Sequence, residues 1–324
     1  MNSDYNEKVK EIKKLAANIR INTLKSLTNL GFGHYGGSLS IVETLAVLYG
    51  GIMNIDSKNP HWEDRDYFVL SKGHAGPALY ATLALKEFFP LEEIYTLNKN
   101  GTNLPSHPDR LRTKGVDATT GSLGQGISIA TGIAKALQID KKSNRVFCII
   151  GDGEINEGQC WEAFQFIAHH KLNNLTVFLD YNKQQLDGTL EEIIKPFSFE
   201  EKMKSFGFDV VTVKGDDIQK MYEILKDQCD AVCLIKPQFE AGPENVGKHG
   251  IVHDHDVHAN VIKHTMQMAQ KIGFNILGVD YSPIKGGKGN IEFLIHLGKD
   301  LANPGQDLWQ GSPVDVVQRA VSGL

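Results

Sequence analysis

Two short apolar runs, each ending in polar residues, constrain the fold of this chain more than any other feature. Residues 146–150 (VFCII) lead directly into Gly151-Asp152-Gly153, and residues 175–180 (LTVFLD) lead into a polar loop. A segment with helical spacing, residues 161–169, lies between the two runs. Strands that alternate with helices form parallel sheets covered on both faces. The sequence therefore predicts an α/β fold with a mostly parallel sheet and helices on both faces.

The same periodicities predict further elements along the chain. Strands are expected at 66–71, 208–213, 231–235, 275–279 and 290–294, and helices at 6–30, 40–53, 123–137, 218–225 and 257–271. A length of 324 residues corresponds to about two domains. We place these domains at residues 1–220 and 221–324. Two arrangements are open for the C-terminal third: its strand at 231–235 continues the sheet of the first domain, or it forms a lobe of its own.

Composition excludes several classes of protein. A net charge of −5 gives no basic surface for nucleic acid or anionic lipid. The sequence contains no run of 18 apolar residues, so no membrane span is expected, and its first residues are too polar for a signal peptide. The four cysteines form no Cys-x-x-Cys pair. These features predict a cytoplasmic protein.

The Gly-Asp-Gly triplet is the most informative chemical signal. Ligands of parallel sheets bind beyond the carboxyl ends of the strands. Gly153 would let the backbone approach a phosphate, and Asp152 offers the hard oxygen that Mg²⁺ prefers. Asn182 follows the next strand, so Asp152 and Asn182 can share one ion. The alternative is an ordinary tight turn between a strand and a helix.

Five motifs, in this order, resemble those of the thiamine diphosphate-binding half of transketolase, over about residues 10–220. They read GHYGGSLS, DRDYFVLSKGHAGPALYATL, NLPSHPD, TGSLGQGIS and GDGEINEGQCWEA. Glu157 in the last motif favours transketolase over deoxyxylulose-phosphate synthase, which usually has glycine there. The resemblance implies a thiamine diphosphate-binding fold and the cofactors thiamine diphosphate and Mg²⁺. It also implies transfer of a two-carbon ketol unit between phosphosugars.

The resemblance assigns roles to individual residues. The histidines expected to line the cleft as catalytic residues are His34, His74 and His107. The expected metal ligands are Asp152, Asn182 and, through its backbone carbonyl, Gln184. The expected cofactor-binding residues are Gly121, Leu123, Gly151, Gly153, Glu157 and Leu186. Each has a plainer alternative: loop histidines are often merely solvated, Leu123 fits a core position, and a carboxylate such as Glu157 is common where a helix begins.

A full-length transketolase is about twice this long, and its second domain supplies the glutamate that activates the cofactor. We therefore expect a partner chain that carries this pyrimidine-binding domain, in a homo- or hetero-oligomer. The family's first half also ends in a Lys-Gly-Lys-Gly segment and a further histidine, which this sequence lacks.

From about residue 222 the sequence resembles the C-terminal part of TlyA-type haemolysins, which are ribosomal RNA ribose methyltransferases with a Rossmann-like fold. The motifs are YEILKDQCDAVCLIKPQFEAGPENVGKHGIV and YSPIKGGKGNIEFLIHL. The resemblance implies that Lys236 and Glu292 are two members of a four-residue catalytic set. The other two members and the methyl-donor glycine loop are missing. Residues 221–324 hold 9 Lys and Arg against 12 Asp and Glu, so this segment lacks the excess of positive charge that RNA binding requires.

The chain is thus expected to be a chimera, joined near residues 215–223. Its primary interpretation is a transketolase-like subunit. The alternatives are a methyltransferase-like or RNA-binding remnant, for which a methyl-donor loop and a basic face would be diagnostic, and a folded but inactive hybrid.

Overall fold

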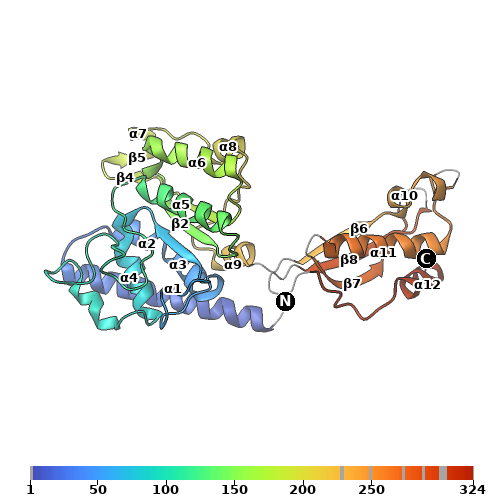
Figure 1. Cartoon of the computed structure of the whole chain (residues 1–324), viewed down its shortest axis with the longest axis horizontal. Helices are drawn as coiled ribbons and strands as arrows, with labels where there is room; N and C mark the ends of the chain where they lie inside the picture. The colour runs from blue at the N-terminus through green and yellow to red at the C-terminus, as the bar shows by residue number, and fades with distance from the viewer. Residues whose placement is uncertain are drawn as a thin grey trace. The chain divides into compact units, whose positions relative to one another are not determined.

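The computed structural model describes residues 3–226, 230–247, 250–271, 274–286, 289–298 and 305–323. The chain divides into two units, Met1–Tyr222 and Glu223–Leu324 (Figure 1). This division lies close to residue 220, where the sequence places the domain boundary. None of the helices in these described ranges has both the length and the apolar character needed to cross a bilayer.

A three-stranded parallel sheet forms the centre of the first unit. Its strands are β1 (Tyr67–Leu70), β2 (Val146–Gly151) and β3 (Leu175–Asp180), in the order β1-β2-β3. All six residues of β2 are buried, as expected for a central strand covered on both faces. The register pairs Gly151 with Asp180, so β2 and β3 end side by side. The expected parallel α/β sheet is confirmed.

Helices cover both faces of this sheet. On one face, α5 (Gln125–Ile139) and α6 (Gly158–His170) share a buried core with alternate residues of the strands, among them Val69. The neighbouring Phe68 points to the other face, where its ring packs edge-on against Tyr49. That second face belongs to α1 (Ser3–Leu30), α3 (Val42–Val47) and α4 (Gly76–Leu85), which pack against one another (Figure 1).

Shorter elements complete the first unit. They are α2 (Tyr35–Leu39), a π-helical turn (Leu48–Ile52), 3-10 turns (Gly73–Ala75, Leu91–Thr96 and Glu154–Asn156), the hairpin β4 (Gln184–Gln185) and β5 (Gly188–Thr189), α7 (Leu190–Ile193), α8 (Phe199–Phe206) and α9 (Ile218–Leu225). The single helix expected at 40–53 is therefore α3 followed by the π-helical turn. A Cβ atom on Gly51 would lie 2.7 Å from the Tyr222 ring, so glycine there allows a close approach that a regular helix side chain would block.

The second unit has its own three-stranded sheet. The strands β6 (Asp230–Ile235), β8 (Phe293–Gly298) and β7 (Asn275–Tyr281) lie in the order β6-β8-β7, and β8 is antiparallel to both neighbours. The helices are α10 (Pro237–Glu240), α11 (His255–Lys271) and α12 (Pro313–Gly323). A core that includes Ile262, Ile295 and Val316 joins α11, the sheet and α12.

Two expectations about strands are wrong, and the structure decides between the two arrangements left open for residues 231–235. Residues 208–213, all within the described ranges, form no strand: Phe208 packs edge-on against Phe164, while Val211 is exposed. Apolar residues at the spacing of a strand therefore do not by themselves produce a ladder. Residues 231–235 do form a strand, but β6 pairs with β8 and does not continue the parallel sheet. The last strand begins at Phe293 and not near Asn290, whose side chain bonds the backbone at Gly250 and Val252.

Candidate active site

Three loops meet at the carboxyl edge of the parallel sheet. Residues 71–74 follow β1, residues 152–153 follow β2 and residues 181–184 follow β3. Because all three strands run the same way, their carboxyl ends share one edge, and polar residues far apart in sequence become neighbours.

Asp152 is the buried centre of this edge, with 3% of its surface exposed. One carboxylate oxygen accepts a hydrogen bond from the backbone N–H of Lys183 at 2.6 Å, and the other accepts from Gly153 N–H at 2.9 Å. Burial raises the pKa of Asp152, and these two backbone bonds oppose the shift by favouring the charged form.

Asn182 and Gln184 belong to the same turn that contacts Asp152. Asn182 Oδ1 accepts a hydrogen bond from Gln184 N–H at 2.9 Å. A carboxylate, an amide oxygen and a backbone carbonyl are the hard donors that Mg²⁺ takes in phosphate-binding sites. The described residues contain no group of three or more His, Cys, Asp and Glu side chains able to hold a metal. A metal ion at this edge would therefore need the Asp152 carboxylate together with the amide oxygen of Asn182 and the backbone carbonyl of Gln184.

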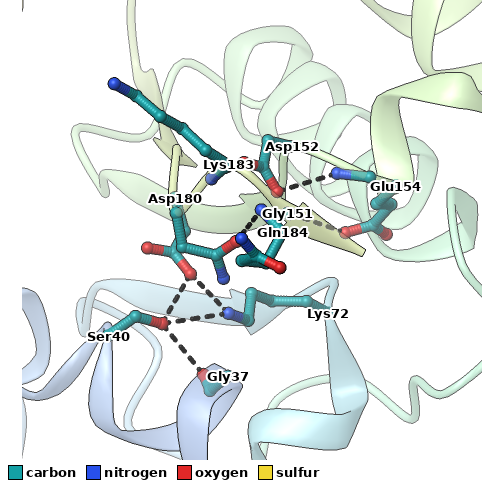
Figure 2. Close-up of polar contacts among 11 residues, drawn as sticks. Gly37, Ser40, Lys72, Gly151, Asp152, Glu154, Asp180, Lys183 and Gln184 are labelled. Atoms are coloured by element: carbon teal, nitrogen blue, oxygen red, sulfur yellow. Dashed lines mark hydrogen bonds and ion pairs between the residues drawn. The ribbon is translucent and has the colours of Figure 1, made fainter. Parts of the chain in front are cut away.

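A buried ion pair lies beside this turn, and the sequence analysis missed it. Lys72 Nζ lies 2.5 Å from Asp180 Oδ2, and Ser40 Oγ donates to the same oxygen at 2.6 Å (Figure 2). The Lys72 side chain is 1% exposed. The available signals were a lysine directly after β1 and a charged residue as the last residue of the apolar run LTVFLD. Lys72 thus places a positive charge at an edge that also carries the carboxylates of Asp152 and Asp180.

The structure brings the three predicted histidines together. The rings of His34 and His74 are 5.0 Å apart, and the His107 ring lies against Gly121. Burial, followed by the positive charge of Lys72, lowers the pKa of His74 to about 4. Burial and His34 also lower the pKa of His107. Both rings are therefore neutral near pH 7 and can either donate or accept a proton.

The glycine loop, residues 121–124, closes one side of the site. Gly121 and Gly124 have φ angles of +146° and +80°, which favour glycine. A Cβ atom on Gly73 would lie 2.8 Å from Gly121 N, so the loop after β1 touches this loop directly. Leu123 is 37% exposed, which rules out the alternative of a core residue. Leu186, in the β4–β5 hairpin, is 91% exposed.

The remaining predicted residues lie on the segment after β2. Gly151 is the last residue of β2, and Gly153 precedes the 3-10 turn with φ −74°, an ordinary helical value. Glu157 is exposed and directly precedes α6, the position of the helix-start carboxylate considered as its alternative. Its Cβ lies 2.9 Å from a Cβ built on Gly124, so Glu157 borders the glycine loop.

The second unit brings Lys236 and Glu292 together, although 55 residues separate them in sequence. Lys236 Nζ lies 3.6 Å from Glu292 Oε1, and Gln238 Nε2 donates to the same oxygen at 3.2 Å. Glu292 is buried, whereas the Lys236 side chain is 43% exposed. This is a partly solvated ion pair at the end of β6.

Comparison with known protein families matches residues 11–276 to "Transketolase, thiamine diphosphate binding domain". The chain is 53% identical over 203 residues to a 6-deoxy-6-sulfo-D-fructose transketolase subunit from Clostridium sp. (strain MSTE9), covering 63% of this chain and 74% of that protein. It is 38% identical over 187 residues to an apulose-4-phosphate transketolase subunit from Phocaeicola vulgatus, covering 58% of this chain and 66% of that protein.

Solved structures agree with these matches. A transketolase variant from Pichia stipitis superposes with a TM-score of 0.64 at 29% identity. The superposition covers 67% of this chain and 34% of that one. The chain thus corresponds to about a third of that transketolase but to most of the Clostridium subunit.

Proposed function

The chain belongs to the transketolase family, whose thiamine diphosphate-binding domain it matches, and we propose that it is the cofactor-binding subunit of a two-chain transketolase. One observation of the structure carries the proposal. Asp152, after β2, accepts a hydrogen bond from the loop that holds Asn182 and Gln184, after β3. The predicted metal ligands, which follow two neighbouring strands, are therefore joined by a hydrogen bond between their loops in the first unit.

The residues at this edge fit the cofactor. Asp152, Asn182 and the Gln184 carbonyl would hold Mg²⁺, and the backbone of the glycine loop and of Gly153 would approach the diphosphate. Leu123 and Leu186 are exposed apolar side chains, which would cover the organic rings. When bound, thiamine diphosphate supplies the electron sink for breaking and making carbon–carbon bonds.

The chain's own contribution to transfer of a two-carbon ketol unit would be binding and proton handling. His34, His74 and His107 would bind sugar hydroxyls and move protons. The lowered pKa values of His74 and His107 keep these two rings neutral at pH 7, so that each can donate or accept a proton. Lys72, ion-paired with Asp180, would keep the Asp180 carboxylate from repelling a diphosphate at this edge.

We propose sugars with an anionic terminal group as substrates. The names of two relatives support this class: one is named for a sulfonated fructose and the other for a sugar phosphate. Phosphosugars are the expected members, and a sulfonated sugar carries the same kind of charge.

We also propose a partner chain that carries the pyrimidine-binding domain. The two relatives are named as subunits, and a full-length transketolase is about three times as long as the part matched here. Cys148, Cys160 and Cys233 are free thiols, which supports the cytoplasmic location that we propose; Cys229 lies outside the described residues.

The test is a calorimetric titration of the whole chain with thiamine diphosphate, with and without Mg²⁺. Saturable binding that requires Mg²⁺ is the expected result. Absence of binding, both alone and in the presence of a pyrimidine-domain chain from a related two-chain transketolase, would contradict the proposal and favour the inactive hybrid.

A second candidate concerns residues 223–324. The contact between Lys236 and Glu292 supports a segment of ribose-methyltransferase type, and with it the chimera. S-adenosylmethionine in the same titration tests this candidate. Because the methyl-donor loop is missing from the sequence, we expect no binding and rank RNA modification below ketol transfer.

A further inference from the structure

A buried carboxylate that the proposed mechanism does not use lies behind the candidate site. Glu154 is 2% exposed and belongs to the 3-10 turn after the Gly-Asp-Gly triplet. Its Oε1 accepts hydrogen bonds from Ser71 Oγ at 2.5 Å and from Gly124 N–H at 2.8 Å. Its Oε2 accepts from Gly151 N–H at 3.0 Å (Figure 2).

The three donors come from three different segments of the site. Ser71 follows β1, Gly124 ends the glycine loop, and Gly151 is the last residue of β2. Ser71 Oγ in turn accepts from Ile127 N–H at 3.1 Å, which extends the network into α5. An ionised carboxylate only accepts hydrogen bonds, so it is the side chain that matches three converging donors.

The surrounding segments leave little room for adjustment. A Cβ atom on Gly126 would lie 2.4 Å from Ser71 Cα, and one on Gly73 would lie 2.8 Å from Gly121 N. The backbone after β1 is therefore in direct contact with the glycine loop and the start of α5. Removing their common acceptor would leave buried N–H groups without a partner and shift the loops relative to one another.

We infer that Glu154 is a positioning residue that fixes the glycine loop, residues 121–124, against the Gly151-Asp152-Gly153 turn in the arrangement that accepts a diphosphate and its metal. This inference rests on the proposed function. Glu154 acts from behind the loops, so its effect reaches the cofactor through Gly124 and Gly151.

The first experiment measures amide hydrogen exchange in the cofactor-free chain and compares the wild type with E154Q. Glutamine keeps the volume but replaces one acceptor oxygen with an NH₂ donor, which faces another N–H. Because E154Q loses hydrogen bonds to a carboxylate acceptor, we expect exchange about tenfold faster or more in peptides that contain Gly124 and Gly151. Exchange in peptides from α4 is expected to stay unchanged. The control E92Q, at an exposed site, is expected to change exchange neither in these peptides nor in those with Gly124 and Gly151.

The second experiment titrates the same variants with thiamine diphosphate and Mg²⁺. E154Q is expected to bind at least about tenfold more weakly than the wild type, by the same loss of charged hydrogen bonds, whereas E92Q binds like the wild type. If E154Q does not fold, S71A replaces it. That variant keeps the carboxylate and removes one donor, and it is expected to show the same pattern on a smaller scale.

The two experiments separate the inference from the proposed function. If the wild type does not bind the cofactor, the proposed function fails, and the exchange measurement still decides whether Glu154 holds the loops. Unchanged exchange at Gly124 and Gly151, or cofactor affinity in E154Q equal to the wild type, would overturn the inference. Faster exchange throughout the unit would also overturn it, since that outcome indicates a general loss of stability.

Discussion

Each of the two sheets has an ion pair at one edge, but the strands that form the two edges differ in their relative direction. In the first unit, β1, β2 and β3 are parallel, so three carboxyl ends meet and three following loops converge. In the second unit, β8 runs antiparallel between β6 and β7, so two carboxyl ends meet one amino end. A parallel edge gathers loops from distant parts of the sequence, which is how Lys72, Asp152 and Asp180 become neighbours.

The ion pairs at these edges show what the difference does to burial. Lys72 is 1% exposed and pairs with Asp180 at 2.5 Å, whereas Lys236 is 43% exposed and pairs with Glu292 at 3.6 Å. Converging loops cover the first lysine, while the second remains accessible to water. Buried pairs are costly to break and exposed pairs contribute little, so substitutions in the two pairs should differ sharply.

The largest expected effect follows from breaking the buried pair. K72M leaves the Asp180 carboxylate without its cation, and we expect it to lower the free energy of unfolding of the first unit by about 3–5 kcal/mol. Urea unfolding measures this change. The double variant K72M/D180N removes both charges and should recover part of the loss. A loss below about 1 kcal/mol in K72M would show that the pair behaves like a surface pair.

The next effect concerns the ligand set at the parallel edge. D152A should reduce Mg²⁺-dependent affinity for thiamine diphosphate by at least about 100-fold, because even residues that only orient a metal ligand contribute about 10–100-fold. Calorimetric titration measures the affinity, and circular dichroism checks that the fold persists. The control is D140A, which alters an exposed carboxylate after α5. Equal affinities in D152A and the wild type would remove Asp152 from the metal site.

A smaller effect is a dependence on pH at the same edge. The pKa of His74 is lowered from 6.5 to about 4, chiefly by burial and then by Lys72. The folded state therefore favours neutral His74, and the unfolded state binds the extra proton first. The stability that this group contributes is complete above pH 6.5 and is lost as the pH falls towards 4.

The pH dependence can be measured in the first unit alone. With Trp309 replaced by Phe, the fluorescence of Trp62 and Trp161 reports only this unit. Urea unfolding between pH 4 and 7 should show falling stability on acidification in this background, and H74N should flatten that profile. Identical profiles with and without H74N would assign the dependence to another group. Burial also lowers the pKa of His258, so the second unit should lose stability in the same direction.

The smallest expected effect comes from the exposed pair. K236A should change the free energy of unfolding by less than about 1 kcal/mol, because water screens a lysine that is 43% exposed. Cofactor affinity should stay at the wild-type value. The same urea and calorimetric measurements apply. A large loss of cofactor affinity in K236A would show that the second unit contributes to the site.

Much of the first unit could be predicted from local patterns. The apolar runs at β1, β2 and β3 appear in the sequence at nearly their final bounds, and the expected parallel sheet follows from the helices between them. The motifs predicted a transketolase-like domain, which the family match confirms. Placing Asp152 beside the loop of Asn182 needed only one further rule, that successive parallel strands end at the same edge.

Other features depended on contacts that no local pattern contains. Residues 208–213 have apolar side chains at the spacing of a strand but form no ladder, and β6 has the pattern of a parallel strand but pairs with antiparallel β8. Periodicity records which side chains are buried, and it does not record which neighbour buries them.

The sequence by itself determined the strands of the parallel sheet, the family and the residues that follow each of these strands, because these depend on neighbours along the chain. Only the tertiary structure decided that Lys72 neutralises Asp180 and that Glu154 accepts hydrogen bonds from three segments at once. The physical reason is that a buried charge is stable only where packing supplies its partners, and those partners lie up to 140 residues away in the sequence.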